Sequence, residues 1–168
     1  RLLRNLLISF GGYDKDNLTG QTIDKLINCD LHEDTKITII MGANSPWINI
    51  INKKVKILPW KTVVLSGVKD MADIMCKSDL AIGSAGSTSW ERCALGLPAI
   101  QIITAVNQHI IAKNLEKEGA VKTLKNLDYL NHFISSTNEW IRDCSDKCKN
   151  VTDGFGVKRV VKEMRKLR

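Results

Sequence analysis

Short apolar runs alternate with segments of helical periodicity along most of the chain. Apolar runs of this length, bounded by small or polar residues, are typical of strands that are buried on both faces of a parallel sheet. We expect such strands at 6–10, 37–41, 55–58, 63–65, 80–82 and 99–103. Apolar residues at helical spacing predict helices between them, at 18–28, 71–77, 87–95 and 107–117. The alternation predicts an α/β fold with a Rossmann-like parallel sheet flanked by helices.

The last quarter of the chain is expected to be entirely helical. We predict one helix over 127–147, a break at Asp153-Gly154-Phe155-Gly156, and a final helix over 157–167. The final helix carries one apolar stripe, formed by Val157, Val160, Val161, Met164 and Leu167. Its basic residues lie largely opposite this stripe, and we interpret them as a solvated face rather than a binding surface.

The positive charge is concentrated at one end of the chain. The 168 residues include 25 Lys and Arg against 18 Asp and Glu, a net charge of +7. From Gly156 to Arg168, six basic residues accompany one acid, Glu163, so this segment supplies +5 of the +7. Aromatic residues, which stack on bases in many nucleic-acid-binding surfaces, make up only 5% of the chain. We therefore expect no nucleic-acid partner.

Neither a membrane span nor a secretory signal is visible in the sequence. The longest stretch without a charged side chain, 93–112, loses its apolar character near Val106 and is too short to cross a bilayer. The five cysteines include no Cys-x-x-Cys pair, which is typical of reduced cytosolic thiols. Cys144 and Cys148 share one helix face, where we expect buried core rather than a metal site. We expect a cytoplasmic protein without metal or cofactor and, since the sequence opens at Arg1, a natural chain that begins further upstream.

Two predicted strands run directly into loops of small residues. Gly11-Gly12 follows the strand at 6–10, and Gly86-Ser87-Thr88 follows the strand at 80–82. In parallel α/β sheets, ligands bind beyond the carboxyl ends of the strands, where glycine lets the backbone approach a phosphate and the next helix offers free N–H groups. Neither loop has the Walker A pattern or the full Gly-x-Gly-x-x-Gly spacing. Each loop on its own fits a phosphate site or a tight strand-to-helix turn equally well.

Glu91 and His109 are the polar residues near these loops that could take part in chemistry. Thr88-Ser89-Trp90-Glu91 has the spacing of a capping box, so Glu91 either bonds back to the helix start or accepts hydrogen bonds from ribose hydroxyls. His109 is the one histidine near the loops by sequence. The chain contains no Gly-x-Ser-x-Gly or His-Glu-x-x-His motif, and we identify no catalytic residue.

Several segments together resemble a known enzyme family. They include Met71-Ala72-Asp73-Ile74-Met75, Ser78-Asp79-Leu80-Ala81-Ile82-Gly83, Gly86-Ser87-Thr88-Ser89-Trp90-Glu91-Arg92-Cys93, Leu95-Gly96-Leu97-Pro98, Asn107-Gln108 and Asp153-Gly154-Phe155-Gly156. This pattern resembles PseG, the UDP-sugar hydrolase of pseudaminic acid biosynthesis, and the similar spore-coat polysaccharide protein SpsG. The looser pattern also resembles the nucleotide-sugar half of MurG-type glycosyltransferases.

The resemblance implies that residues 1–168 form the C-terminal, UDP-binding half of a GT-B architecture, with the N-terminal catalytic domain absent from this chain. It implies a substrate, a UDP-linked 2,4-diacetamido-trideoxy sugar, from which water displaces UDP at the anomeric carbon during surface polysaccharide or nonulosonic acid biosynthesis. In that family a glycine-rich, histidine-bearing loop of the N-terminal domain takes part, and this sequence lacks it. The alternatives are the donor domain of a MurG-like glycosyltransferase and a non-catalytic nucleotide-sugar-binding module.

The resemblance also implies roles for individual residues. The diphosphate would be held by Gly11, Gly12, Gly86, Ser87 and Thr88, the ribose by Glu91, and the sugar or phosphate side by Asn107 and Gln108. The uracil base would lie against a loop at 58–68.

Overall fold

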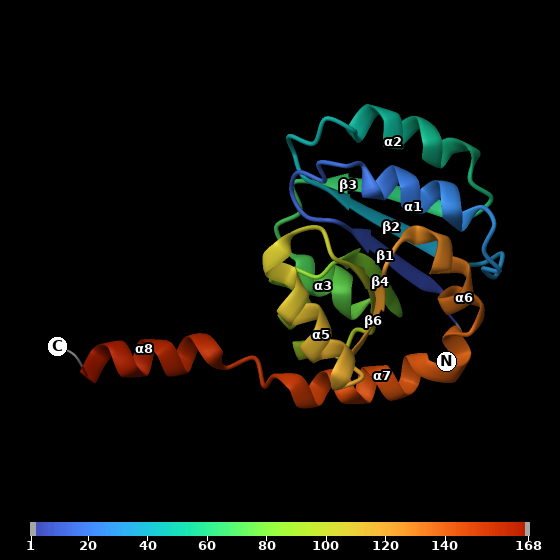
Figure 1. Ribbon diagram of the computed structural model, residues 1–168. Helices are drawn as coiled ribbons and strands as arrows, with labels where there is room; N and C mark the ends of the chain where they lie inside the picture. Colours follow the sequence, from blue (N-terminus) through green and yellow to red (C-terminus); the bar gives the residue numbers. More distant parts are fainter. Residues whose placement is uncertain (1–2, 167–168) are drawn as a thin grey trace.

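The computed structural model describes residues 3–166 of the chain. Its centre is a six-stranded parallel sheet in the order β3-β2-β1-β4-β5-β6 (Figure 1). The strands are β1 Asn5–Ser9, β2 Lys36–Met41, β3 Lys61–Ser66, β4 Leu80–Ser84, β5 Ala99–Ile102 and β6 Val121–Leu124. The predicted α/β fold with a parallel sheet is therefore confirmed.

Helices cover both faces of the sheet. The connections are α1 Leu18–Leu26, α2 Ile48–Lys54, α3 Met71–Cys76, α4 Thr88–Ala94 and α5 His109–Lys117, with short 3-10 turns η1 Val55–Ile57 and η2 Val106–Gln108. Residues of α1 and α2 share one core cluster, whereas residues of α3, α4 and α5 share another on the opposite face. The chain winds outward in both directions from β1 and β4, so the direction of winding reverses between these two strands.

Alternating side chains of β1 show how the sheet separates the two cores. Leu6 and Ile8 pack into the cluster with α1 and α2, whereas Leu7 packs into the other cluster, and all three are at most 1% exposed. Successive side chains of a strand point to opposite faces, so a strand buried on both faces is apolar throughout. The apolar runs of the sequence located most of the strands for this reason.

The C-terminal part contains three helices and a short 3-10 turn. These are η3 Leu127–Tyr129, α6 Leu130–Ser135, α7 Thr137–Val151 and α8 Gly156–Lys166. Cys144 and Cys148 of α7 lie in the core, as expected. Helix α8 projects away from the body (Figure 1), and none of its residues is buried. The apolar stripe predicted for it is exposed over residues 157–164, and Leu167 lies outside the described residues.

Two predictions of secondary structure are wrong, and two elements were not predicted. The expected strand at 55–58 is a 3-10 turn that continues α2, because Val55 extends the helical spacing of the buried Ile51 while Ile57 is 78% exposed. Helix α2 and the edge strand β6 were not predicted; only the first and last residues of β6 are buried, so it lacks a continuous apolar run. The helix expected over 127–147 is interrupted at Ser136, between α6 and α7.

Within residues 3–166, no helix has both the length and the apolar character needed to cross a membrane.

Candidate functional site

The candidate site lies at the carboxyl ends of β1 and β4, where the winding of the sheet reverses. At this point Ser9 of β1 pairs with Gly83 of β4. A Cβ atom on Gly83 would lie 2.2 Å from the carbonyl oxygen of Ser9 and 3.3 Å from Nη1 of Arg92. Position 83 therefore requires glycine, and the side chain of a buried arginine lies close to this strand pair. Parallel α/β sheets commonly bind ligands at such a reversal.

The loop after β1 provides exposed glycine backbone but no open helix terminus. Gly11 has a φ of +89°, and both Gly11 and Gly12 are exposed. The Asp14 carboxylate accepts hydrogen bonds from the N–H groups of Leu18 (2.8 Å) and Thr19 (2.9 Å) at the start of α1. The expectation that α1 offers free N–H groups to a phosphate is therefore wrong, because a carboxylate of the chain already occupies that position.

The loop after β4 differs from the loop after β1 because it leaves hydrogen-bond donors unbound. Ser87 is the N-cap residue of α4, and its hydroxyl makes no cap hydrogen bond. The backbone N–H groups of Gly86, Ser87 and Thr88 have no acceptor among residues 3–166. Three consecutive N–H donors and the hydroxyl of Ser87 are thus available to an anion at this edge of the sheet.

Arg92 lies beneath this loop. Its Nη2 donates to the Ser84 carbonyl oxygen (3.0 Å) and to Oγ of Ser89 (2.9 Å), and its Nη1 donates to Oγ1 of Thr88 (3.4 Å). The side chain is only 3% exposed, and desolvation lowers the pKa of Arg92 to about 10, so it is protonated at neutral pH. In the sequence, Arg92 stands out only as part of a motif, because an arginine on a short helix is normally a surface residue.

Gln108 lies in η2, which follows β5, and its side chain reaches the loop after β4. Its Oε1 accepts hydrogen bonds from the backbone N–H (2.9 Å) and the hydroxyl (3.1 Å) of Thr104. A Cβ atom on Gly86 would lie 3.7 Å from Nε2 of Gln108, so the amide nitrogen faces the loop. Asn107 is exposed on η2. The structure thus brings Gln108 close to Gly86.

The capping-box interpretation of Glu91 is wrong. The helix begins one residue earlier than a capping box at Thr88 requires: Ser87 is the N-cap, and Thr88 is the first helical residue. Glu91 is exposed, and its carboxylate makes no hydrogen bond or ion pair within the described part of the chain. Its carboxylate therefore remains available on the first turn of α4. His109 is likewise exposed, at the first position of α5.

The expectation of a base-binding loop at 58–68 needs correction. Residues Lys61–Ser66 form β3, so Leu58 precedes the strand and lies at the opposite edge of the sheet from the candidate site. Only Gly67 and Val68, directly after β3, reach the edge where the glycine loops lie.

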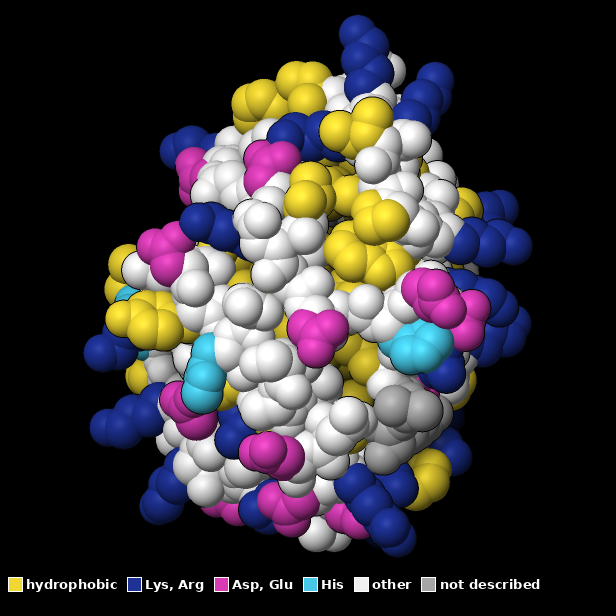
Figure 2. All heavy atoms as spheres, turned by 90° about the vertical axis from the view of Figure 1, so that its right-hand side faces the viewer, with side chains coloured by type: hydrophobic (Ala, Val, Ile, Leu, Met, Phe, Trp, Pro, Cys, Tyr) yellow, Lys and Arg dark blue, Asp and Glu magenta, His cyan; other side chains and the backbone are white. Residues whose placement is uncertain are grey.

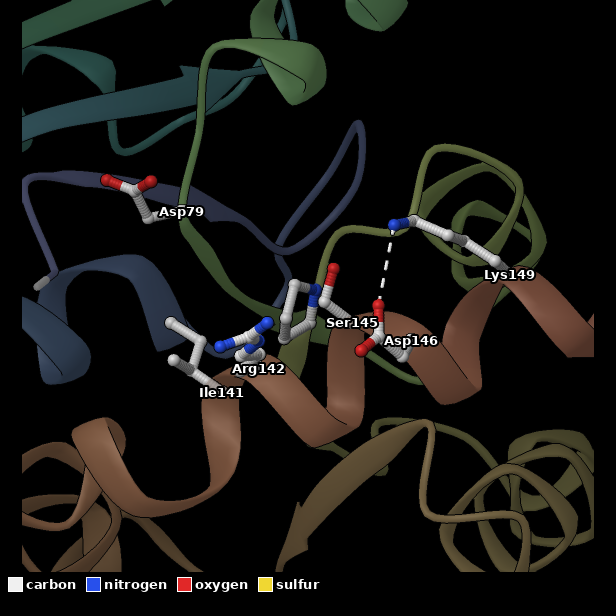
Figure 3. Close-up of a pocket in the computed structure, with 7 residues that line it drawn as sticks. Asp79, Ile141, Arg142, Ser145, Asp146 and Lys149 are labelled. Atoms are coloured by element: carbon white, nitrogen blue, oxygen red, sulfur yellow. Dashed lines mark ion pairs between the residues drawn. The ribbon is translucent and has the colours of Figure 1, made fainter. Parts of the chain in front are cut away.

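A hollow of about 440 Å³ lies at the opposite edge, where the strands begin (Figure 3). It is lined by Asp79, Pro98, Ile141, Arg142, Ser145, Asp146 and Lys149. Asp79 accepts hydrogen bonds from the N–H groups of Arg4 and Asn5, and Lys149 pairs with Asp146 at 3.6 Å. Figure 2 shows that acidic, basic and hydrophobic side chains are interspersed on this face. Since these polar groups bind other parts of the chain, we assign no ligand to the hollow.

Within the described residues, no group of three or more His, Cys, Asp or Glu side chains is placed to hold a metal ion.

Comparison with known proteins places this geometry in a family. The chain is 25% identical over 121 residues to the spore coat polysaccharide biosynthesis protein SpsG of Bacillus subtilis, covering 72% of the chain and 35% of SpsG. It is 32% identical over 124 residues to the UDP-N-acetylglucosamine–N-acetylmuramyl-(pentapeptide) pyrophosphoryl-undecaprenol N-acetylglucosamine transferase of Clostridioides difficile, covering 70% of the chain and 30% of that enzyme. The chain spans 20% to 35% of the length of the curated relatives it matches.

Solved structures agree on the fold. MurG of Acinetobacter baumannii superposes with a TM-score of 0.82 at 21% identity, over 99% of this chain and 50% of MurG. The fold is that of the C-terminal domain of this GT-B protein. The model of the glycosyltransferase family 28 C-terminal domain matches residues 12–152, which is most of the chain. The chain therefore belongs to the glycosyltransferase family 28 C-terminal domain family.

Proposed function

We propose that this chain binds the UDP portion of a UDP-sugar at the carboxyl ends of β1 and β4, as the nucleotide-sugar domain of a larger enzyme. One observation carries the proposal: the N–H groups of Gly86, Ser87 and Thr88 have no acceptor among the described residues, and the same segment contacts the buried guanidinium of Arg92 through the Thr88 hydroxyl. Unbound N–H donors beside a positive charge suit a diphosphate. Family membership, and a neighbour at TM-score 0.69 whose structure is described as bound to UDP-GlcNAc, support the same ligand class.

The residues of the site take distinct roles in this proposal. Gly86, Ser87 and Thr88 hold the diphosphate through N–H groups and hydroxyls, and Gln108 reaches the same region through Nε2. Gly11 and Gly12 let the ligand approach closely, because no atom of the described chain lies within 4 Å of a Cβ built on either glycine. The Glu91 carboxylate accepts hydrogen bonds from the ribose hydroxyls, and Asn107 lies on the sugar side.

The chemical contribution of this domain is electrostatic. When the bond from the anomeric carbon to the diphosphate breaks, negative charge develops on the departing UDP. Prearranged N–H groups, hydroxyls and a buried cation stabilise that charge in the transition state. The described residues near the loops include no nucleophile paired with a base, so we expect the group that activates the acceptor to come from the rest of the protein.

Transfer of the sugar to an acceptor is the reaction that the relatives favour. The family is one of glycosyltransferases, and both the C. difficile relative and A. baumannii MurG belong to that class by name. Hydrolysis by water is the second candidate, because the match to SpsG accompanies the PseG-like motif around Gly86–Cys93. The two reactions use the leaving-group half in the same way and differ only in the nucleophile that attacks the sugar.

Titration calorimetry of the 168-residue chain tests the binding proposal. We expect UDP to bind more tightly than ADP, and uridine to bind much more weakly than UDP because it lacks the diphosphate. Absence of a saturable UDP signal at millimolar ligand, from protein shown to be folded by circular dichroism, would refute the proposal. Product analysis with the full-length enzyme then separates transfer from hydrolysis: a glycosylated acceptor indicates transfer, and the free sugar indicates hydrolysis.

A further inference from the structure

Arg92 is a buried cation without an acidic partner. It is 3% exposed, and the two similarly buried carboxylates, Asp14 and Asp79, bind backbone N–H groups elsewhere in the chain. None of the ion pairs within residues 3–166 includes Arg92, and its neighbour Glu91 is exposed. The guanidinium therefore donates its hydrogen bonds only to neutral oxygen atoms, and the Glu91 carboxylate attracts it without forming an ion pair.

Such an arrangement is costly for the free protein. A buried ion that lacks a counter-charge costs on the order of several kcal/mol, and hydrogen bonds to neutral acceptors recover only part of that cost. The Nε atom of Arg92 also has no hydrogen-bond acceptor among the described residues. A structural role alone would be served equally well by an apolar side chain of similar volume. The charge itself thus points to a ligand of opposite sign.

The hydrogen bonds around Arg92 have a fixed direction. A guanidinium only donates, so Oγ1 of Thr88 must accept the bond from Nη1, and the Thr88 hydroxyl proton is left to point elsewhere. Ser89 accepts from Arg92 in the same way and donates to Oε1 of Gln101 (3.5 Å). Nε2 of Gln101 donates in turn to Oγ1 of Thr123 (3.2 Å). The first turn of α4 is thereby tied to β5 and β6, and the Thr88 hydroxyl keeps its proton for another acceptor.

We propose that Arg92 is a positioning residue for the diphosphate: it orients the Thr88 hydroxyl to donate to a phosphate oxygen, and the bound diphosphate supplies the counter-charge that the buried guanidinium lacks. The inference rests on the proposed function, because it names what holds the phosphate loop of that same site. Arg92 acts from beneath the loop and through Thr88, since its own side chain is almost completely covered.

The experiment measures the affinities of the wild type and of four variants for UDP and for uridine. Arg92→Met removes the charge. Arg92→Lys keeps the charge but loses the planar guanidinium, and Thr88→Val removes the hydroxyl while keeping the shape of the side chain. Arg142→Met is the matched control, because Arg142 is exposed on α7 at the opposite edge of the sheet. We expect Arg92→Met to weaken UDP binding by about tenfold or more, the range for hydrogen bonds to charged groups. Uridine binding should be unchanged, and Arg142→Met should match the wild type for both ligands.

A double-mutant cycle tests whether Arg92 acts through Thr88. If it does, Arg92→Lys and Thr88→Val combined weaken UDP binding by less than the product of the two single losses. Losses that simply multiply would overturn the positioning role, and so would an Arg92→Met chain that binds UDP like the wild type. Should Arg92→Met fail to fold, the cycle decides alone, because Arg92→Lys retains the buried charge.

The same measurements keep the two proposals distinguishable. A wild-type chain that binds neither UDP nor inorganic pyrophosphate refutes the proposed function together with the role of Arg92. A wild-type chain that binds UDP, with Arg92 variants that bind it equally well, refutes only the role of Arg92. A variant that loses uridine and UDP binding in the same proportion shows a purely structural effect and also overturns the inference.

Discussion

Glu91 gives the sharpest test of ribose recognition, because the structure removes its competing role. Thr88 is inside α4 rather than at its cap, so no capping box exists for Glu91 to complete. The carboxylate is exposed and makes no hydrogen bond within residues 3–166. Replacing Glu91 with glutamine keeps the size of the side chain and removes its charge. We expect the folded variant to bind UDP more weakly than the wild type.

The size of the effect follows from what each role would cost. A carboxylate that accepts hydrogen bonds from ribose hydroxyls contributes about 1.5–3 kcal/mol, so Glu91→Gln should raise the dissociation constant of UDP roughly 10- to 150-fold. The remaining structural role is an interaction with the helix dipole, because Glu91 lies in the first turn of α4. That interaction contributes about 0.3–1 kcal/mol, which corresponds to at most a few degrees in Tm for a chain of this length.

Glu139 is the matched control for this experiment. It is also an exposed acid in the first turn of a helix, but it lies on α7, away from the glycine loops. Glu139→Gln should lower Tm by a similar small amount and leave UDP affinity unchanged. Calorimetry and thermal melting are measured on both variants. A Glu91→Gln chain with wild-type affinity for UDP would show that this carboxylate does not bind the ribose.

Four further outcomes follow from the structure. Gly83→Ala should lower the unfolding free energy by about 1–3 kcal/mol in denaturant titrations, because its Cβ would lie 2.2 Å from the Ser9 carbonyl oxygen. Asp14→Ala should cost about 1–2 kcal/mol by the same measurement without weakening UDP binding, since it removes the acceptor of the Leu18 and Thr19 N–H groups and leaves the Asn17 cap of α1 in place. A Cβ at Gly12 lies more than 4 Å from every described residue other than its chain neighbours, so Gly12→Ala should leave Tm unchanged, and a weaker UDP affinity would report direct contact with the ligand. Only Cys76 is exposed among the five cysteines, so a thiol reagent should modify one site rapidly and the other four only after unfolding.

Much of the fold could be predicted from the sequence because strands buried on both faces leave a distinctive pattern. The runs that became β1, β2 and β4 are apolar on both faces of the sheet, and no helix of ordinary amphipathicity gives that signal. The pattern failed where burial is partial. Edge strand β6 buries only Val121 and Leu124, and the run 55–58 alternates like a strand although Val55 continues a helix.

The candidate site was predictable only in outline. Glycines after strands locate a loop, but the sequence does not show which backbone N–H groups the chain itself will occupy. Asp14 accepts hydrogen bonds from the N–H groups of the residues four and five positions later, at the start of α1, and its own backbone is left-handed. No periodicity of the sequence reveals these bonds. The burial of Arg92 depends on tertiary packing between β4 and β5, and its sequence neighbours do not indicate it. The roles of the individual site residues stay predictions.

The two glycine loops differ in the charge that lies next to them, and we expect this difference to orient the proposed diphosphate ligand. Behind the first loop lies a carboxylate, Asp14, whose charge is bound to the start of α1; behind the second lies a guanidinium, Arg92, with open N–H donors above it. A negatively charged group placed between the loops is therefore drawn toward β4 and away from the α1 terminus. The backbone of the first loop can then lie close to the ligand without attracting its phosphates. For the proposed function, we therefore expect the leaving group to lie over β4, on the side where Gln108 meets Gly86.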